Sequence, residues 1–132
     1  MVTPEIKLLR DEHYRGLYDL FDAHGWKHMR GWRFNQDLSF VALREGRVIG
    51  FVTAWHDGQP YAWVDALAVL PEYQHQGLGS WLCLVMERLL LDRGVKALRA
   101  ASSNTVVIEG LTKHGFQGEP QMVLDKFYED TP

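Results

Sequence analysis

Two glycines, Gly77 and Gly79, lie between an apolar run that ends at Leu70 and a second apolar run, 81–91, that has helical spacing. Because glycine has no Cβ, the backbone can approach a ligand closely at these positions. If the second run forms a helix, the amides of its first turn lack helical acceptors, and the helix dipole favours an anion there. The residues therefore indicate a site for a phosphate-bearing ligand at this junction. The alternative is a plain strand-to-helix corner that the glycines allow to pack tightly.

Two common phosphate-binding motifs do not fit the junction. A P-loop carries Lys and then Ser or Thr directly after its last glycine, whereas Ser80 and Trp81 follow Gly79 here. The dinucleotide fingerprint needs a third glycine three residues after the second, and Leu82 occupies that place. Both motifs can be set aside.

A longer pattern surrounds the glycines. Residues 67–79 read LAVLPEYQHQGLG, and further along the chain Asn104 precedes a Gly115-Phe116 pair. Together these features resemble the GNAT N-acetyltransferases, whose acyl-CoA-binding signature is Gln/Arg-x-x-Gly-x-Gly/Ala and whose next helix is led by asparagine and ends in Gly-Phe. The resemblance extends over residues 40–128 and is far more specific than the glycine pair alone.

The resemblance implies a fold and a reaction. The expected fold is one α/β (α+β) domain over residues 1–132. Its sheet is expected to be mixed and mostly antiparallel, with about six or seven strands flanked by about four helices. The expected activity is transfer of an acetyl group from acetyl-CoA to a primary amine of a small molecule or protein, with no metal. A homodimer is common in the family.

Cofactor-binding residues follow from matching this chain to the family signature. In the family, one strand splays from its parallel neighbour, and its free backbone groups pair with the pantetheine arm. The matching residues are Leu67 and Val69. Asn104 matches the family asparagine near the cofactor arm, although a simple helix cap is an equal alternative. Backbone amides from six consecutive residues would hold the pyrophosphate: His75, Gln76, Gly77, Leu78, Gly79 and Ser80.

Asp65 is the candidate catalytic base. It precedes Leu67 by two residues and therefore lies on the same side of the strand, where some family members place an acidic residue. Between Trp63 and Leu67, desolvation would raise the pKa of the Asp65 carboxyl group, which suits a proton acceptor. The alternative is a strand carboxylate that bonds a neighbouring donor.

The general acid of the family has no counterpart in this chain. Many members carry a tyrosine seven residues after the asparagine, which protonates the leaving thiolate, and that position is Leu111 here. Tyr61, Tyr73 and Tyr128 are available by composition only, and solvent could also protonate the thiolate. Two functions stay open: an N-acetyltransferase, or a non-catalytic module that binds acyl-CoA as a sensor or regulator. The enzyme is favoured because direct transfer depends heavily on positioning.

The elements before the glycines can be predicted from periodicity. Residues 5–9 predict an edge strand, and Asp11 predicts the N-cap of a helix that Gly25 closes. Segments 40–44 and 47–55 predict a hairpin, and a turn at residues 57–58 leads into a strand over 61–70. These segments predict an antiparallel meander.

The elements after the glycines continue the pattern. The helix over 81–91 has Trp81, Leu84, Val85 and Leu89 at helical spacing, and Gly94 ends it. Residues 95–101 predict a strand parallel to its predecessor. A helix capped by residue 103 or 104 then runs to residue 114, with Gly115 at its left-handed C′ position. Final strands are predicted at residue 116 and over 122–128.

The connection over residues 24–36 is rich in aromatic, basic and glycine residues and has no clean period. In the family this connection forms one wall of the acceptor cleft. We therefore expect some of Trp26, Trp32 and Phe34 to line that cleft. The alternative is a surface loop with these aromatics packed onto the core.

Composition limits the remaining possibilities. The chain has 132 residues, enough for a single hydrophobic core, and a net charge of −3, which disfavours nucleic acid as a partner. The only cysteine, Cys83, excludes an intrachain disulfide and a multi-cysteine metal site, and an ordinary packed thiol is expected. Neither a membrane span nor a signal peptide is evident, so a cytoplasmic location is expected.

Overall fold

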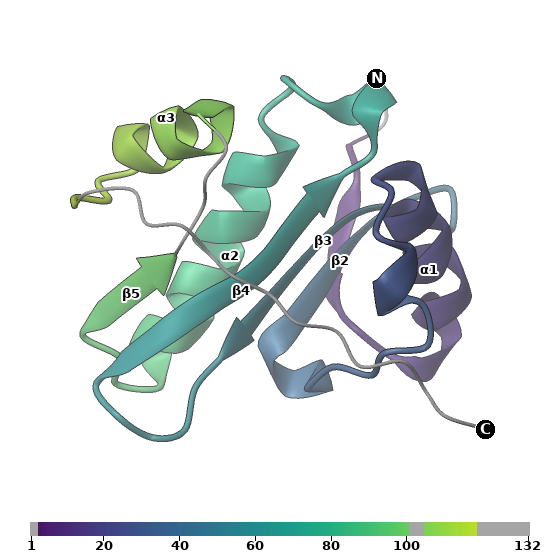
Figure 1. The fold of residues 1–132 in the computed structure, drawn as a ribbon. Coiled ribbons are helices and arrows are strands. Elements are labelled where there is room, and N and C mark those ends of the chain that lie inside the picture. The colour runs from purple at the N-terminus through teal and green to yellow at the C-terminus, as the bar shows by residue number, and fades with distance from the viewer. Residues whose placement is uncertain (1–2, 101–104, 119–132) are drawn as a thin grey trace. The chain divides into compact units, whose positions relative to one another are not determined.

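The computed structural model describes residues 3–100 and 105–118 of the chain. The chain divides into two compact units, residues 1–99 and 100–132, and each is described by itself. The first unit holds nearly all of the sheet and two α-helices, α1 (Tyr14–Ala23) and α2 (Leu78–Asp92), as Figure 1 shows. The second unit holds α3 (Thr105–Lys113).

The described strands form one sheet, in the order β1 (Glu5–Leu8), β2 (Ser39–Arg44), β3 (Arg47–Trp55), β4 (Tyr61–Val69), β5 (Ala97–Ala100). The first four strands run antiparallel to their neighbours, and β5 points the same way as β4 after the α2 crossover (Figure 1). Glu45 and Gly46 have φ values of 52° and 80°, as a two-residue type I′ hairpin turn requires. The predicted meander and mixed sheet are confirmed.

The three α-helices that the structure describes end in the same way. Each is followed by a glycine with positive φ: Gly25 at 73°, Gly94 at 87° and Gly115 at 89°. The amide of the residue after the glycine then donates to a carbonyl five residues earlier, over 2.9–3.1 Å. This Schellman geometry satisfies carbonyls that the helix leaves unpaired. The three predicted helix ends are confirmed.

Helices α1 and α2 cover opposite faces of the sheet. Phe51 of β3 packs edge-on against Phe21 of α1, with ring centroids 5.6 Å apart. Gly50 precedes Phe51 and therefore faces the other side of the sheet. A Cβ on Gly50 would lie 2.9 Å from Leu82 Cδ1 of α2, so the glycine allows this helix to approach the sheet closely.

The buried face of α2 differs from the one that the sequence suggested. The helix begins at Leu78, and its buried side chains are Leu78, Leu82, Met86 and Leu90. Trp81 and Leu84, which we expected on its apolar face, are 38% and 54% exposed. The reason is that α2 is apolar on most sides, so periodicity alone does not select one face.

The prediction that Asp11 caps α1 is wrong. Asp11 lies in a 3-10 turn, Asp11–His13, that precedes the helix. The imidazole of His13 caps this 3-10 turn, because its Nδ1 accepts a hydrogen bond from the Arg10 amide over 3.0 Å, and no side chain caps α1 itself among the described residues. The carboxylate of Asp11 is therefore available for contacts elsewhere.

The described residues contain fewer elements than expected, namely five strands and three α-helices. Phe116 follows α3 without joining a strand. The strand predicted over 122–128 and the helix-capping residues 103 and 104 lie outside the described residues. None of the described helices has the length and apolar character needed to cross a membrane.

Candidate active site

The strand-to-helix junction predicted from the glycines is present. Strand β4 ends at Val69, a 3-10 turn covers Pro71–Tyr73, and Gly77 is the N-cap of α2. The first helical hydrogen bond runs from the Trp81 amide to the Gly77 carbonyl over 3.0 Å. The amides of Gly77, Leu78 and Gly79 have no acceptor among the described residues. These N–H groups lie at the positive end of a 15-residue helix, where an anion is favoured.

The two glycines serve different purposes. Gly77 has a φ of +84°, and no protein atom lies within 4 Å of the position that its Cβ would occupy. Gly77 therefore satisfies a left-handed backbone and leaves the space beside it open. Gly79 has ordinary helical geometry, and its Cβ would only touch Val69 Cγ2 at 3.8 Å and Leu67 Cδ2 at 3.9 Å. This position can accept alanine, as the signature allows.

Asp65 is the extra residue of a β-bulge. In the β3–β4 register, Thr53 pairs with Ala66 and Ala54 pairs with Val64, so Asp65 has no residue opposite it. Bulges redirect side chains and are common beside active sites. The side chain is exposed, yet partial desolvation raises the pKa of its carboxyl group above the ordinary value. Asp65 has no hydrogen-bond or ion-pair partner among the described residues, so the alternative of a satisfied strand carboxylate is not supported.

Among the described residues, no strand covers one edge of the second half of β4. Strand β5 begins beside Pro60, whose carbonyl accepts from the Ala97 amide over 3.1 Å. Its four residues reach only about 13 Å along β4. Within the described residues, Leu67 and Val69 therefore have β3 on one side and no strand on the other.

The Val69 carbonyl points toward this open edge. The Leu70 amide of the same peptide unit donates to Ile49 of β3 over 2.9 Å, so the carbonyl faces away from β3. Two side chains donate to it: His24 Nε2 at 2.8 Å and Gln74 Nε2 at 3.0 Å. The sequence predicted Val69 as a backbone contact for a cofactor. It gave no signal for His24, which lies at the C-terminal end of α1.

The structure describes some of the candidate proton donors. Leu111 lies in α3. Tyr73 lies directly after β4 and packs against the core, whereas the ring of Tyr61 lies beneath the Arg99 guanidinium, 4.5 Å from its Cζ. Asn104 and Tyr128 lie outside the described residues. Burial and the nearby Glu87 raise the pKa of the Cys83 thiol, which agrees with a packed thiol rather than a nucleophile.

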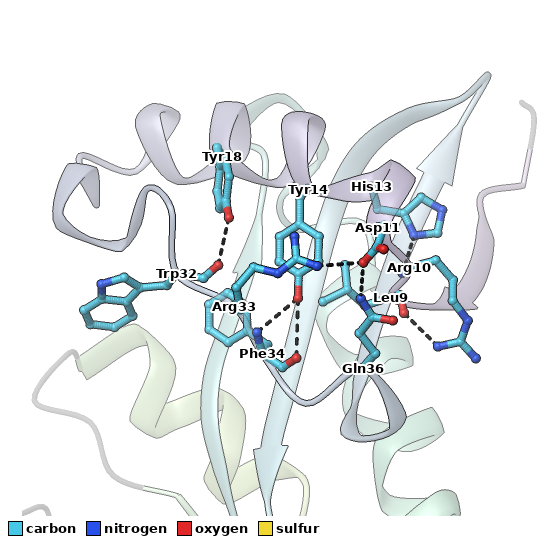
Figure 2. A network of polar contacts seen from close by, with 10 residues as sticks. All are labelled: Leu9, Arg10, Asp11, His13, Tyr14, Tyr18, Trp32, Arg33, Phe34 and Gln36. Carbon is cyan, nitrogen blue, oxygen red and sulfur yellow. Dashed lines mark hydrogen bonds and ion pairs between the residues drawn. The ribbon is translucent and has the colours of Figure 1, made fainter.

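The connection over residues 24–36 packs partly onto the core. Trp26 and Phe34 are half-buried against it, as the packing alternative anticipated, whereas Trp32 is 44% exposed. Two tyrosines of α1 hold the backbone of this connection, as Figure 2 shows. The Tyr14 hydroxyl accepts from the Phe34 amide at 3.0 Å and donates to its carbonyl at 3.4 Å. The Tyr18 hydroxyl donates to the Trp32 carbonyl at 2.9 Å.

Asp11 provides a second attachment for the connection (Figure 2). Its Oδ1 accepts from Gln36 Nε2 at 2.7 Å and from Arg33 Nη2 at 2.6 Å. The Arg33 guanidinium also lies 3.8 Å from the centre of the Tyr14 ring. The hydrogen bonds from Gln36 and Arg33, together with the charge of Arg33, hold the pKa of the Asp11 carboxyl below its ordinary value.

The sequence matches one known protein family. The model of the acetyltransferase (GNAT) family matches residues 6–116. A search of curated proteins found no significant match.

Many solved structures resemble the fold, at low sequence identity. The PaiA N-acetyltransferase of Thermoplasma acidophilum, solved with coenzyme A, superposes with a TM-score of 0.73 at 20% identity, covering 89% of this chain and 92% of that chain. An aminoglycoside acetyltransferase from an uncultured soil sample, solved with sisomicin, superposes with a TM-score of 0.73 at 21% identity, and the match covers 97% of both chains. The ribosomal-protein-S18-alanine N-acetyltransferase of Escherichia coli superposes with a TM-score of 0.68 at 24% identity. This match covers 86% of this chain and 77% of that chain.

Proposed function

The chain belongs to the GNAT family of acetyltransferases, and from this premise we propose that it transfers an acetyl group from acetyl-CoA to a primary amine. The transfer is direct, within a ternary complex of enzyme, acetyl-CoA and amine. The observation that carries the proposal is found in the described part of the chain: an open β4 edge beside a helix N-terminus at which the amides of residues 77–79 are unpaired. A pantetheine arm fits the first feature, and a pyrophosphate fits the second.

The proposed cofactor position follows the direction of the chain. The pyrophosphate lies against the amides of residues 75–80, beside the open space at Gly77. The pantetheine arm runs back along β4 past Val69 and Leu67, which brings the thioester toward the bulge at Asp65. Asn104 belongs to this proposal only through its match to the family signature.

The proposed chemistry needs a neutral amine. Asp65 accepts a proton from the incoming ammonium group, directly or through water, and the raised pKa of its carboxyl favours this step. The amine nitrogen then forms a bond to the thioester carbon, the carbon–sulfur bond breaks, and the nitrogen releases its second proton to solvent to leave a neutral amide. The CoA thiolate takes up a proton from solvent or from a tyrosine, since Leu111 has no proton to donate. As Asp65 must be ionised, activity should rise as the pH passes upward through its raised pKa.

Two relatives support the two substrates of this proposal. The Thermoplasma acidophilum enzyme was solved with coenzyme A, and the soil-sample enzyme with the aminoglycoside sisomicin. A second candidate function is an acyl-CoA-binding module without turnover, which the leucine at position 111 favours.

The test is calorimetric titration of acetyl-CoA into the wild type and into Gly77→Glu. We expect clear binding to the wild type and loss of binding in the variant, because a carboxylate would enter the space proposed for the pyrophosphate. The matched control is Gly46→Glu, in the β2–β3 turn. Gly46 has a φ of +80° and the same open surroundings, so the backbone strain is comparable.

The wild type and the two glycine variants together distinguish the possible functions. Equal binding to folded Gly77→Glu and to Gly46→Glu would show that the pyrophosphate lies elsewhere. Binding to the wild type followed by thiol release with an amine supports the enzyme. Binding without thiol release across a broad amine panel would favour the module.

A further inference from the structure

Two neighbouring strands, β3 and β4, present aromatic side chains together on one face of the sheet. Trp55 of β3 lies directly opposite Trp63 of β4, and Tyr61 lies two residues before Trp63. Trp55 is 48% exposed, and Trp63 and Tyr61 are half-buried. An exposed aromatic surface of this kind commonly marks a binding site.

This aromatic surface lies on the α1 face of the sheet. Residues 51, 53 and 55 of β3 alternate onto one side, and Phe51 packs against Phe21 of α1. Trp55 therefore shares the face of α1, and its partner Trp63 does too. Helix α2, whose N-terminus is proposed to hold the cofactor, covers the opposite face. A second substrate can thus reach β4 from the side that the cofactor leaves open.

Arg99 adds a positive charge to this surface. Its Cζ lies 4.5 Å from the centre of the Tyr61 ring and 5.8 Å from that of Trp63. Such cation–π contacts hold the guanidinium plane but do not use its N–H donors. In the described part of the chain, no hydrogen-bond acceptor or carboxylate pairs with Arg99. The guanidinium is oriented in advance, and its donors are available to a ligand.

Asp65 supplies the opposite charge. It is the bulge residue of β4, two positions along the chain from Trp63, and it also lacks a partner among the described residues. Arg99 and Asp65 do not form an ion pair with each other. In the described part of the chain, the aromatic surface and the bulge that follows it on β4 therefore carry two unpaired charges of opposite sign, and the Arg99 charge lies over Tyr61 and Trp63. This arrangement is complementary to a zwitterion that has an apolar body.

We propose that the acceptor is an amine that also carries a carboxylate, such as an amino acid, and that Arg99 binds the carboxylate while the amine faces Asp65. This inference rests on the proposed acetyl transfer and names its acceptor class. A guanidinium binds a carboxylate through two parallel N–H···O bonds, which fixes the orientation of the ligand. The apolar part of the acceptor contacts Trp55. Proton transfer to Asp65 then leaves a neutral amine for attack on the thioester.

Matched pairs of amines, differing only in a carboxylate, test the inference. Suitable pairs are tryptophan with tryptamine, phenylalanine with phenethylamine, and leucine with isoamylamine. Thiol release is measured at saturating acetyl-CoA for the wild type, for Arg99→Gln and for Arg88→Gln. Arg88 is an exposed arginine of α2 and serves as the matched control.

We expect the wild type to prefer the carboxylated member of at least one pair. In Arg99→Gln, KM for that amine should rise about tenfold or more, since hydrogen bonds between charged groups are lost. KM for acetyl-CoA and turnover of the uncarboxylated amine should stay unchanged, and Arg88→Gln should behave as the wild type. A wild-type preference for the uncarboxylated amines, or a carboxylate preference that survives in Arg99→Gln, would overturn the inference. So would a rise in KM for acetyl-CoA alone.

A binding measurement separates this inference from the proposed function. The amino acids are titrated into the wild type and Arg99→Gln, both saturated with CoA. If acetyl-CoA binds but no amine is acetylated, Arg99-dependent binding of an amino acid supports the inference, and the absence of such binding refutes it. Failure of acetyl-CoA to bind contradicts the proposed function and removes the premise of the inference.

Discussion

Two side chains donate hydrogen bonds to one backbone oxygen on β4, the carbonyl of Val69. His24 approaches it from the end of α1, and Gln74 from the turn before α2. A carbonyl has two lone pairs, so both are engaged. The same carbonyl is proposed to face the pantetheine arm. A cofactor amide that bonds to Val69 must therefore replace one of these donors.

This competition predicts the effect of His24→Ala on cofactor affinity. With only Gln74 bonded to it, the Val69 carbonyl can accept from the pantetheine without losing a protein hydrogen bond. Since one hydrogen bond contributes about 1 kcal/mol net, we expect acetyl-CoA to bind about fivefold more tightly, as measured by calorimetry.

The control for this substitution is His56→Ala. His56 makes the same kind of contact, from Nε2 to the Gln59 carbonyl at 2.8 Å, in the turn between β3 and β4. This variant should leave acetyl-CoA affinity unchanged. Weaker binding to folded His24→Ala would contradict the competition and would indicate that His24 contacts the cofactor itself.

The sequence predicted some of the individual residues of the candidate site. The signature drew attention to Gly77 and Val69, and the structure gives Gly77 a left-handed backbone and Val69 a carbonyl that faces away from β3; their contacts with a cofactor stay a prediction. The direction of the Asp65 pKa shift, upward through desolvation, was also predicted. His24 could not be found in this way, because its contact joins residues 45 apart in the chain.

Two tyrosine hydroxyls of α1 hold the connection over residues 24–36 against this helix. Tyr14 is 4% exposed, and its hydroxyl is the acceptor for the Phe34 amide. Tyr18 bonds only the Trp32 carbonyl, at an exposed position. Replacing each tyrosine with phenylalanine keeps the ring and removes the hydroxyl, so the two changes compare a buried contact with an exposed one.

Tyr14→Phe should therefore destabilise the protein more than Tyr18→Phe. The partly buried Phe34 amide would lose its partner at a cost of about 1 kcal/mol or more. The Trp32 carbonyl can bond water instead, so a change within about 0.5 kcal/mol is expected for Tyr18→Phe. Urea unfolding measures both values. Equal losses of unfolding free energy in the two variants would show that the Tyr14 hydroxyl does not anchor the connection.

The elements themselves were largely predictable, and the exceptions have physical causes. The glycines after α1, α2 and α3 predicted the helix ends, because a Schellman turn needs a residue with a left-handed backbone. The buried face of α2 was not predictable, since apolar residues surround most of the helix and the sheet decides which ones are covered. The bulge at Asp65 was also missed, because it is defined by register with β3.

For the whole molecule, two aspartates link stability to pH with opposite signs. The folded state lowers the pKa of Asp11, first through its bond from Gln36 and then through Arg33. Asp11 therefore contributes stability at neutral pH, and this contribution is lost as the pH falls through its lowered pKa. The folded state raises the pKa of Asp65 by desolvation. Ionised Asp65 therefore costs stability above its raised pKa, and that cost disappears on acidification.

The variants Asp11→Asn and Asp65→Asn should consequently change the stability of the fold in opposite directions at neutral pH. At about pH 7, Asp11→Asn should unfold at lower urea than the wild type and Asp65→Asn at higher urea. The difference for Asp65→Asn should disappear toward about pH 3, where an ordinary aspartate is largely protonated, whereas the difference for Asp11→Asn should disappear only at lower pH, because folding lowers the pKa of Asp11. Each variant serves as the other's control, because both replace a carboxylate with an amide. Loss of stability in Asp65→Asn at neutral pH would show that a donor satisfies this carboxylate. A stability gain combined with loss of acetyl transfer would indicate that the charge is retained for the reaction despite its cost to folding.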